Sequence, residues 1–144
     1  MMLLVRDIMT GWVATAEPER SLRDAATIMA KAHLGSLIII SEGKPVGILT
    51  EGDISRALSE GANPDKATIK KVMSKRLVTV SPDKKVEEAA KLMAEKQIKK
   101  LPVVERGSLI GMVTQTDIVA SSFDLVTSLK EMVGARYRPP DFEP

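Results

Sequence analysis

The residues with the clearest chemical pattern in this sequence are two threonine–aspartate pairs. The segments 47–53 and 111–117 both read Gly, two apolar residues, Thr, two further residues and Asp. A threonine followed three residues later by an acid is typical of a helix N-terminus, where both side chains cap backbone N–H groups. A carboxylate there also suits the positive end of the helix dipole. Taken locally, the pattern favours a capping role for both pairs.

The same arrangement can also hold a ligand. Phosphate groups bind readily at open helix N-termini. An acidic side chain beside them can accept hydrogen bonds from the hydroxyls of a ribose, as acids do in dinucleotide sites. Capping and ligand binding are compatible. The two pairs, Thr50 with Asp53 and Thr114 with Asp117, are therefore the first candidates for a ligand site.

The remaining residue types argue against catalysis and against a metal centre. The 144 residues include no cysteine and one histidine, His33, which leaves neither thiolate chemistry nor a His-rich metal site. The repeated aspartates have no His or Cys partner near them in the sequence, and nothing else recurs with catalytic spacing. We predict a protein that is not an enzyme, requires no cofactor and holds no metal.

Charge and hydropathy predict a cytoplasmic globular protein without a membrane partner. Hydrophobic residues make up 44% and charged residues 28% of the chain, as in ordinary globular domains. The N-terminus lacks a signal-peptide pattern, and no apolar run approaches the roughly 20 residues of a membrane span. The net charge of +2 is too balanced to indicate a polyanion partner. Basic residues do cluster near the middle of the chain, but with few aromatic residues to stack on bases we expect no nucleic-acid partner. This basic cluster comprises Lys66, Lys70, Lys71, Lys75 and Arg76.

The threonine–aspartate pairs belong to a long internal repeat. With an offset of 64 residues, 5–54 aligns with 69–118 without a gap. Identical residues coincide, among them Met9 with Met73, and most apolar positions fall on apolar positions. A chance match does not keep both register and polarity over such a length. We therefore predict two copies of one unit, packed as a pseudo-twofold pair.

Each copy carries the signals of a β-α-β-β-α unit. A short strand is followed by an amphipathic helix, by two strands joined through a turn with glycine, and by a second helix. One unit alone leaves its apolar face uncovered, which predicts an α+β fold in which the two units pack together. The expected strands are 13–15, 34–40 and 46–50 in the first copy and 77–80, 98–104 and 110–114 in the second. The expected first helices are 22–33 and 86–97, and the second helices start at Thr50 and Thr114.

Turn and helix-stop residues divide the chain. Gly61, Asn63 and Pro64 mark a helix stop and a turn between the copies. We assign 1–62 to the first repeat with its N-terminal linker, 63–122 to the second repeat, and 123–144 to a C-terminal helix and tail.

The order and duplication of several short motifs resemble the CBS domain family, named for cystathionine beta-synthase, in its paired form. The resemblance covers roughly residues 5–120, and it implies two β-α-β-β-α repeats packed as a pseudo-twofold pair. The first copy departs from the pattern, because Ile38 stands where the second copy has Pro102, and Gly35-Ser36 stand where it has Lys99-Lys100. The motifs are D-I-M-T at 7–10, V-M-S at 72–74, T-V-S-P-D at 79–83, L-P-V-V at 101–104, and the two G-x-x-T-x-x-D segments.

The resemblance implies two clefts between the repeats that bind AMP, ADP, ATP or S-adenosylmethionine. In such pairs a cleft combines the T-x-x-D of one copy with the first strand of the other. Carried over, the Asp117 cleft comprises Thr114, Thr116, Asp117, Lys99, Lys100, Arg6, Val13, Ala14 and Leu34. The Asp53 cleft comprises Thr50, Asp53, Lys70, Leu77, Val78 and Ile98.

Charge predicts that the two clefts differ. Lys99, Lys100 and Arg6 give the Asp117 cleft three cations, whereas the Asp53 cleft has Lys70 alone. Because charge-assisted bonds to phosphate are about twice as strong as neutral ones, we expect the Asp117 cleft to prefer the more phosphorylated ligand. A solvated, charged turn is an equal alternative for the two lysines. Trp12, beside the first strand, suits either a stacking platform or an edge or dimer contact.

The function that these features predict is regulation by ligand sensing. The resemblance implies a homodimer. Because no effector domain is evident in the sequence, we also expect a separate effector protein. The alternative is a structural dimerisation module, or scaffold, whose clefts stay empty.

Overall fold

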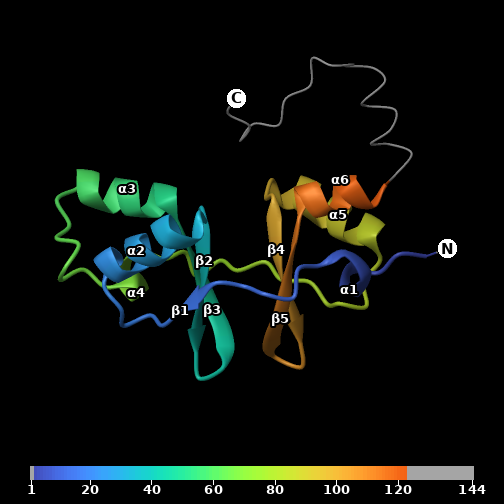
Figure 1. Ribbon diagram of the computed structural model, residues 1–144, viewed down its shortest axis with the longest axis horizontal. Coiled ribbons are helices and arrows are strands. Elements are labelled where there is room, and N and C mark those ends of the chain that lie inside the picture. Colours follow the sequence, from blue (N-terminus) through green and yellow to red (C-terminus); the bar gives the residue numbers. More distant parts are fainter. Residues whose placement is uncertain (1, 123–144) are drawn as a thin grey trace, which may run out of the picture.

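The computed structural model describes residues 2–122, which form two similar halves side by side (Figure 1). In chain order the elements are α1 (Val5–Ile8), β1 (Thr15–Ala16), α2 (Leu22–Ala32), β2 (Ser36–Ser41), β3 (Lys44–Thr50), α3 (Glu51–Ser59), α4 (Ile69–Val72), α5 (Val86–Lys96), β4 (Lys100–Glu105), β5 (Ser108–Thr114) and α6 (Gln115–Ser121). The expected β-α-β-β-α order is recognisable in both halves, with α1 and α4 as additional short helices.

The helices α2 and α5 form where the apolar spacing predicted them. In α2 the buried residues Leu22, Ala25 and Met29 lie on one face, as the three- and four-residue spacing requires. The first turn is capped by Ser21, whose hydroxyl accepts a hydrogen bond from the N–H of Asp24 at 3.1 Å. The helix stops at His33, which adopts a left-handed conformation with φ of 54°. In α5 the buried residues Val86, Ala89 and Met93 and the left-handed Gln97 repeat the pattern of α2, but the N-cap residue Lys85 makes no side-chain cap.

The paired strands of each half form an antiparallel hairpin with a two-residue turn. In the first hairpin, Glu42 and Gly43 both have positive φ, 53° and 78°, which matches the twist that a tight hairpin needs. The second hairpin repeats this turn at the equivalent residues. Both hairpins lead directly into a helix, β3 into α3 and β5 into α6, and this junction holds the threonine–aspartate pair.

The first strand differs between the halves. In the first repeat, β1 pairs in parallel with β2, and the N–H of Ile38 donates to the carbonyl of Ala14 at 3.2 Å. The second repeat has Pro102 at the position of Ile38, and proline has no N–H to donate. The strand expected at 77–80 is therefore reduced to a single bridge between Val80 and Val103. The strand expected at 13–15 lies slightly later in the chain, at Thr15–Ala16.

Each hydrophobic core is completed by the short helix that precedes the other repeat. Val5 of α1 is fully buried in the core of the second half, and Ile69 of α4 is fully buried in the core of the first. Full burial of such a side chain contributes about 1.5–3 kcal/mol. The segment after α1 then crosses the front of the molecule to reach β1 (Figure 1). The two repeats are thus joined by exchanged segments rather than by a simple linker.

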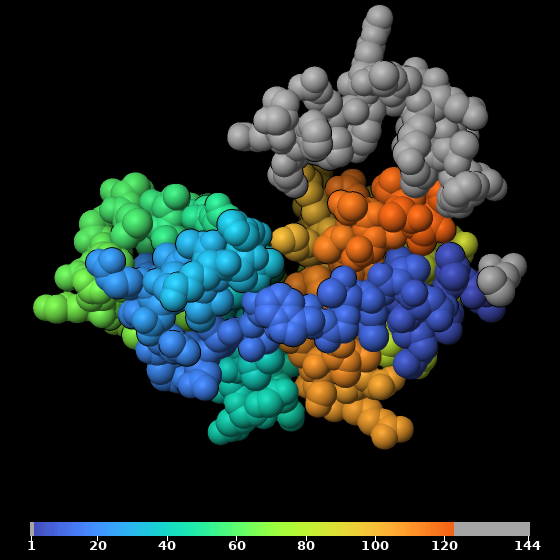
Figure 2. Space-filling view, in the orientation of Figure 1, coloured from blue at the N-terminus to red at the C-terminus, as the bar shows by residue number. Residues whose placement is uncertain are grey.

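The exchanged segments also add to the edges of the hairpins. Thr10 and Met112 exchange two backbone hydrogen bonds of 2.9 Å, and Ser74 and Ile48 form the equivalent pair at 2.9 and 3.0 Å. Gly111 permits this approach, because a Cβ there would lie 2.7 Å from the carbonyl oxygen of Thr10. Space-filling atoms of the N-terminal segment bridge the two halves (Figure 2).

The α+β fold of two packed repeats is confirmed. The division of the chain at 62 and 63 stays a prediction, and packing crosses it in both directions. The helix and tail expected at 123–144 lie outside the described residues. Within residues 2–122, no helix has the length and apolar character needed to cross a membrane.

Candidate functional site

Both threonine–aspartate pairs form complete capping boxes. The hydroxyl of Thr114 accepts a hydrogen bond from the N–H of Asp117 at 3.1 Å, and the N–H of Thr114 donates to Oδ2 of Asp117 at 2.9 Å. Thr50 and Asp53 make the same two bonds at the same lengths. The capping interpretation is correct for both helices, and it fixes each carboxylate at a strand-to-helix corner.

The two carboxylates differ in what their second oxygen contacts. Oδ1 of Asp53 lies 3.3 Å from a guanidinium nitrogen of Arg56, one helical turn later. The position of Arg56 in the second repeat is occupied by Ala120, which cannot form such a pair. Among the described residues, no hydrogen bond or ion pair reaches Oδ1 of Asp117. Asp117 therefore keeps an open acceptor, whereas the acceptor of Asp53 is occupied.

A cavity of about 190 Å³ lies beside Thr114, where segments of both repeats meet. Its walls come from the N-terminal crossing segment, from β2 and the residues before it, and from the paired ends of β4 and β5. The lining residues are Thr10, Trp12, Val13, Ala14, Leu34, Ser36, Ile38, Lys100, Met112 and Thr114.

The lining of this cavity is mostly apolar with a few polar groups at its edge. Ile38 is fully buried, while Lys100 and Trp12 are exposed. Ligand sites typically combine an apolar lining with a small number of placed polar groups in this way, although they usually measure about 300–1,000 Å³. At about 190 Å³ the cavity is smaller than a typical ligand site.

Five of the nine residues predicted for the Asp117 cleft line this one cavity: Val13, Ala14, Leu34, Lys100 and Thr114. Asp117 accepts a hydrogen bond from the N–H of Thr114, which lines the cavity, and therefore lies next to it. The others lie apart from it. Thr116 is exposed in the first turn of α6, and Lys99 lines a groove between α5 and α6.

A family model for the CBS domain matches the chain twice, at residues 5–60 and 69–124. The chain belongs to the CBS domain family. The two matches correspond to the two repeats of the internal alignment, so the resemblance found in the motifs is confirmed. CBS pairs commonly serve as ligand-sensing regulatory modules.

Curated relatives of this CBS pair include short and long proteins. It is 32% identical over 117 residues to the CBS domain-containing protein YhcV of Bacillus subtilis, covering 81% of this chain and 84% of that one. It is 38% identical over 129 residues to an uncharacterized protein of Methanopyrus kandleri, covering 88% of this chain but only 63% of the relative. Relatives named as enzymes are much longer, and the chain spans only 22–24% of them.

Solved structures include CBS pairs with the same fold. The CBS domain pair of protein MJ0100, in complex with 5'-methylthioadenosine and S-adenosyl-L-methionine, superimposes with a TM-score of 0.75 at 33% identity. The match covers 86% of this chain and 98% of that structure. The likeness confirms the tandem CBS fold, and it shows that a related pair binds adenosine-containing molecules.

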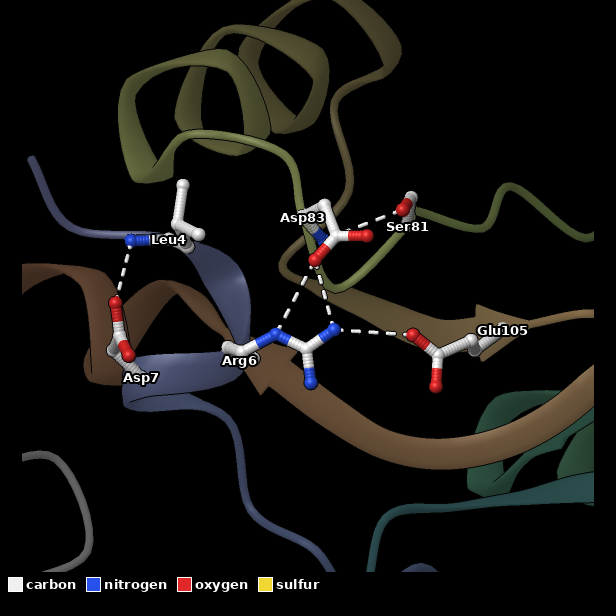
Figure 3. A network of polar contacts seen from close by, with 6 residues as sticks. All are labelled: Leu4, Arg6, Asp7, Ser81, Asp83 and Glu105. Atoms are coloured by element: carbon white, nitrogen blue, oxygen red, sulfur yellow. Dashed lines mark hydrogen bonds and ion pairs between the residues drawn. The ribbon is translucent and has the colours of Figure 1, made fainter.

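In this CBS pair the predicted role of Arg6 in the Asp117 cleft stays a prediction, and its guanidinium is paired elsewhere. Arg6 pairs with Asp83 at 2.8 Å and with Glu105 at 3.1 Å, as Figure 3 shows. Glu105 ends β4, at the opposite end of that strand from Lys100, so the guanidinium is far from Thr114. Hydrogen bonds to Asp83 and Glu105 and the attraction of their charges raise the pKa of Arg6 above its ordinary value. The side chain anchors α1 to the second repeat.

The residues predicted for the Asp53 cleft lie in several different surroundings. Val78 and Ile98 pack against the core of the second repeat. Leu77 lines a different cavity, of about 410 Å³, between the two hairpins. Lys70 is exposed on α4. Thr50 holds its capping box. The Asp53 cleft stays a prediction.

The sequence did not assign five of the lining residues to the Asp117 cleft: Thr10, Trp12, Ser36, Ile38 and Met112. Of these, only Trp12 is interpreted from the sequence as a candidate stacking platform. Thr10 and Met112 are joined by backbone hydrogen bonds, although they lie about 100 residues apart in the sequence. The repeat alignment carries no signal for that contact. In the sequence, Ser36 and Ile38 stand out only as departures from the second copy.

Proposed function

We propose that this CBS pair is a regulatory module that senses an adenosine-containing ligand in the Asp117 cleft. The observation that carries the proposal is the capped Asp117 carboxylate, with an open Oδ1, standing beside a mostly apolar cavity formed by both repeats. A ligand in this cavity would contact the crossing segment of one repeat and the strand end of the other. Binding would then stabilise one relative arrangement of the two halves.

Each part of such a ligand has a chemically suitable partner. Oδ1 of Asp117 can accept hydrogen bonds from the two hydroxyls of a ribose. Lys100 at the rim can bind a phosphate or a carboxylate. Val13 and Ala14 offer apolar contact to a base. AMP, ADP, ATP and S-adenosylmethionine all fit this description, and the last is a ligand of the MJ0100 pair.

The charge around the cavity bears on the preference for phosphate. Of the three cations expected there, only Lys100 lines the cavity, because Arg6 is paired elsewhere and Lys99 lies in a groove on the helices. A single lysine supports a weaker preference for phosphorylated ligands than three cations would. We therefore propose the nucleoside part of the ligand as the main source of affinity.

Calorimetry on the Asp117→Asn variant tests the proposal directly. Asparagine keeps an oxygen that can accept the N–H of Thr114, so the helix remains capped, but it loses the open carboxylate oxygen. Because hydrogen bonds to charged groups contribute about 1.5–3 kcal/mol, affinity for AMP, ATP or S-adenosylmethionine should fall at least about tenfold. Asp24→Asn, the equivalent position in the first turn of α2, is the matched control and should bind as the wild type does.

Thermal melting separates the proposal from the scaffold alternative. A ligand at 100 times its Kd stabilises the folded state by about 2.7 kcal/mol. If AMP, ATP and S-adenosylmethionine all leave the melting temperature of the wild type unchanged, the sensing function is wrong and the scaffold function remains.

We also propose that the active form is a homodimer that acts on a separate effector protein. Apolar grooves lie on the helical surface of both halves, between α2 and α3 and between α5 and α6. They are similar in size, about 430 and 490 Å³, and in lining, with Met29, Ala30 and Ile54 in one and Met93, Ala94 and Ile118 in the other. Two copies of the chain can cover both grooves at once, which supports a second copy as their occupant.

A further inference from the structure

Trp12 stands at the rim of the Asp117 cleft with 65% of its surface exposed. It is the only Phe, Trp or Tyr within residues 2–122. A single exposed apolar side chain needs no explanation by itself. This one, however, lines the same cavity as Lys100 and Thr114, where a planar group has a use.

The backbone holds Trp12 in place from both sides. On one side, Thr10 is bonded to Met112 through two hydrogen bonds of 2.9 Å. On the other, the carbonyl of Ala14 accepts a hydrogen bond from the N–H of Ile38 at 3.2 Å. The backbone of the short segment between these anchors is therefore attached to β5 of one repeat and to β2 of the other, and the indole lines the cavity between them.

The pseudo-twofold relation shows that the fold does not demand a tryptophan here. The position equivalent to Trp12 in the second copy is Arg76, and the residue before each is Gly11 or Lys75. Arg76 is exposed as well, so neither site requires an apolar side chain for packing. The difference distinguishes the two positions chemically, because Trp12 supplies an aromatic ring where the equivalent residue Arg76 supplies a guanidinium.

We propose that Trp12 is the base-stacking residue of the Asp117 cleft and makes the nucleobase a main source of ligand affinity. The base lies against the indole while the ribose hydroxyls bind Oδ1 of Asp117, and any phosphate extends toward Lys100. This assignment rests on the proposed function and deepens it. It predicts that base and ribose set the affinity, so that adenosine binds nearly as well as ATP, whereas ribose 5-phosphate binds poorly.

The sole tryptophan makes the test direct, because stacking against a base alters indole emission. Wild-type protein is titrated with adenosine, 5'-methylthioadenosine, AMP, ATP and ribose 5-phosphate, and emission is compared with calorimetry on the same samples. We expect the four nucleosides and nucleotides to quench emission with the calorimetric Kd, and ribose 5-phosphate to leave it unchanged.

Variants then measure the contribution of the ring. Base–aromatic stacking contributes about 1–3 kcal/mol per base, so Trp12→Ala should weaken binding roughly 5- to 150-fold. The loss should be the same for adenosine and for ATP, because stacking does not involve the phosphates. Trp12→Phe should retain part of the affinity, and Arg76→Ala on the opposite crossing segment is the matched control. Because Trp12 and Arg76 are both exposed, all three variants should keep the melting temperature of the wild type.

The outcomes separate this inference from the proposed function. Suppose that ligands bind to the wild type and that Asp117→Asn weakens this binding. If Trp12→Ala then binds as tightly as the wild type, and if ligands leave the emission of the wild type unchanged, the stacking role is wrong and the sensing function stands. If none of the nucleosides or nucleotides binds in calorimetry, both are wrong. If emission changes when the protein is diluted but not when ligand is added, Trp12 lies in a contact between copies and the stacking role is wrong.

Discussion

Asp53 and Asp117 occupy equivalent positions, and a single residue in the next helical turn decides whether the carboxylate is open. Both accept the N–H of their threonine through Oδ2 at 2.9 Å. Arg56 then occupies Oδ1 of Asp53, whereas Ala120 leaves Oδ1 of Asp117 open. The capping boxes were predictable from the four-residue pattern alone. The difference at the second oxygen was also present in the sequence, but it becomes meaningful only once the helix is known to extend through Ala120.

Placing an arginine at position 120 should therefore make the Asp117 cleft resemble the other one. In Ala120→Arg the guanidinium can reach Oδ1 of Asp117 with the spacing of Arg56 and Asp53, and it competes with a ligand's hydroxyls. An exposed ion pair of this kind contributes about 0.2–1 kcal/mol, so nucleoside affinity measured by calorimetry should fall by up to about fivefold. Ala120→Met adds a long side chain without charge and should bind as the wild type does. If both variants lower nucleoside affinity equally, the cause is the size of the new side chain, and the role of Oδ1 is contradicted.

At the scale of elements, the crossing segments determine where the cavity forms. The offset of 64 residues revealed the two units and their helices, because apolar periodicity is a local property. It did not reveal that α1 and α4 each complete the opposite core, since four-residue helices carry too few residues for a periodic signal. The loss of the strand at 77–80 follows from Pro102, which lacks the N–H that Ile38 uses. That substitution was visible in the sequence, but its consequence depends on which strand lies beside it.

Gly111 tests the attachment of the N-terminal crossing segment. Alanine there would place its Cβ 2.7 Å from the carbonyl oxygen of Thr10, so the segment must shift away from β5. Overpacking of this kind typically costs about 1–3 kcal/mol, and Gly111→Ala should lower the free energy of unfolding measured by urea denaturation by that amount. Ligand affinity should fall as well, because Thr10 and Met112 line the cavity.

Gly11→Ala is the control for that substitution. It lies in the same crossing segment, and a Cβ there meets no atom within 4 Å. Its stability should remain within about 0.5 kcal/mol of the wild type, as is usual for surface substitutions. A similar loss of stability in both variants would mean that the segment tolerates no side chain at all, and the specific contact with Thr10 would not be the cause.

At the scale of the whole molecule, the exchanged helices make the two repeats one cooperative unit. Val5, which precedes the first repeat, is fully buried in the core of the second, and Ile69, which precedes the second repeat, is fully buried in the core of the first. A cut between the repeats therefore removes a buried side chain from each core. Under the proposed function, a ligand that contacts both halves would use this coupling to shift the whole pair, within the limit set by its differential affinity for the two arrangements.

The proposed dimer places the helical grooves, rather than the hairpins, between copies. Val119 lines the groove between α5 and α6 and is 36% exposed, so Val119→Lys adds a charge to this surface without disturbing the core. Because an unpaired charge is costly to bury in an apolar interface, sedimentation velocity over a dilution series should show a dimer dissociation constant at least about tenfold higher than that of the wild type. Ser108→Lys, at the exposed start of β5, adds the same charge far from the grooves and should leave the dissociation constant unchanged. If the wild type sediments as a monomer at every concentration, or if Val119→Lys dimerises as tightly as the wild type, the grooves do not serve this contact.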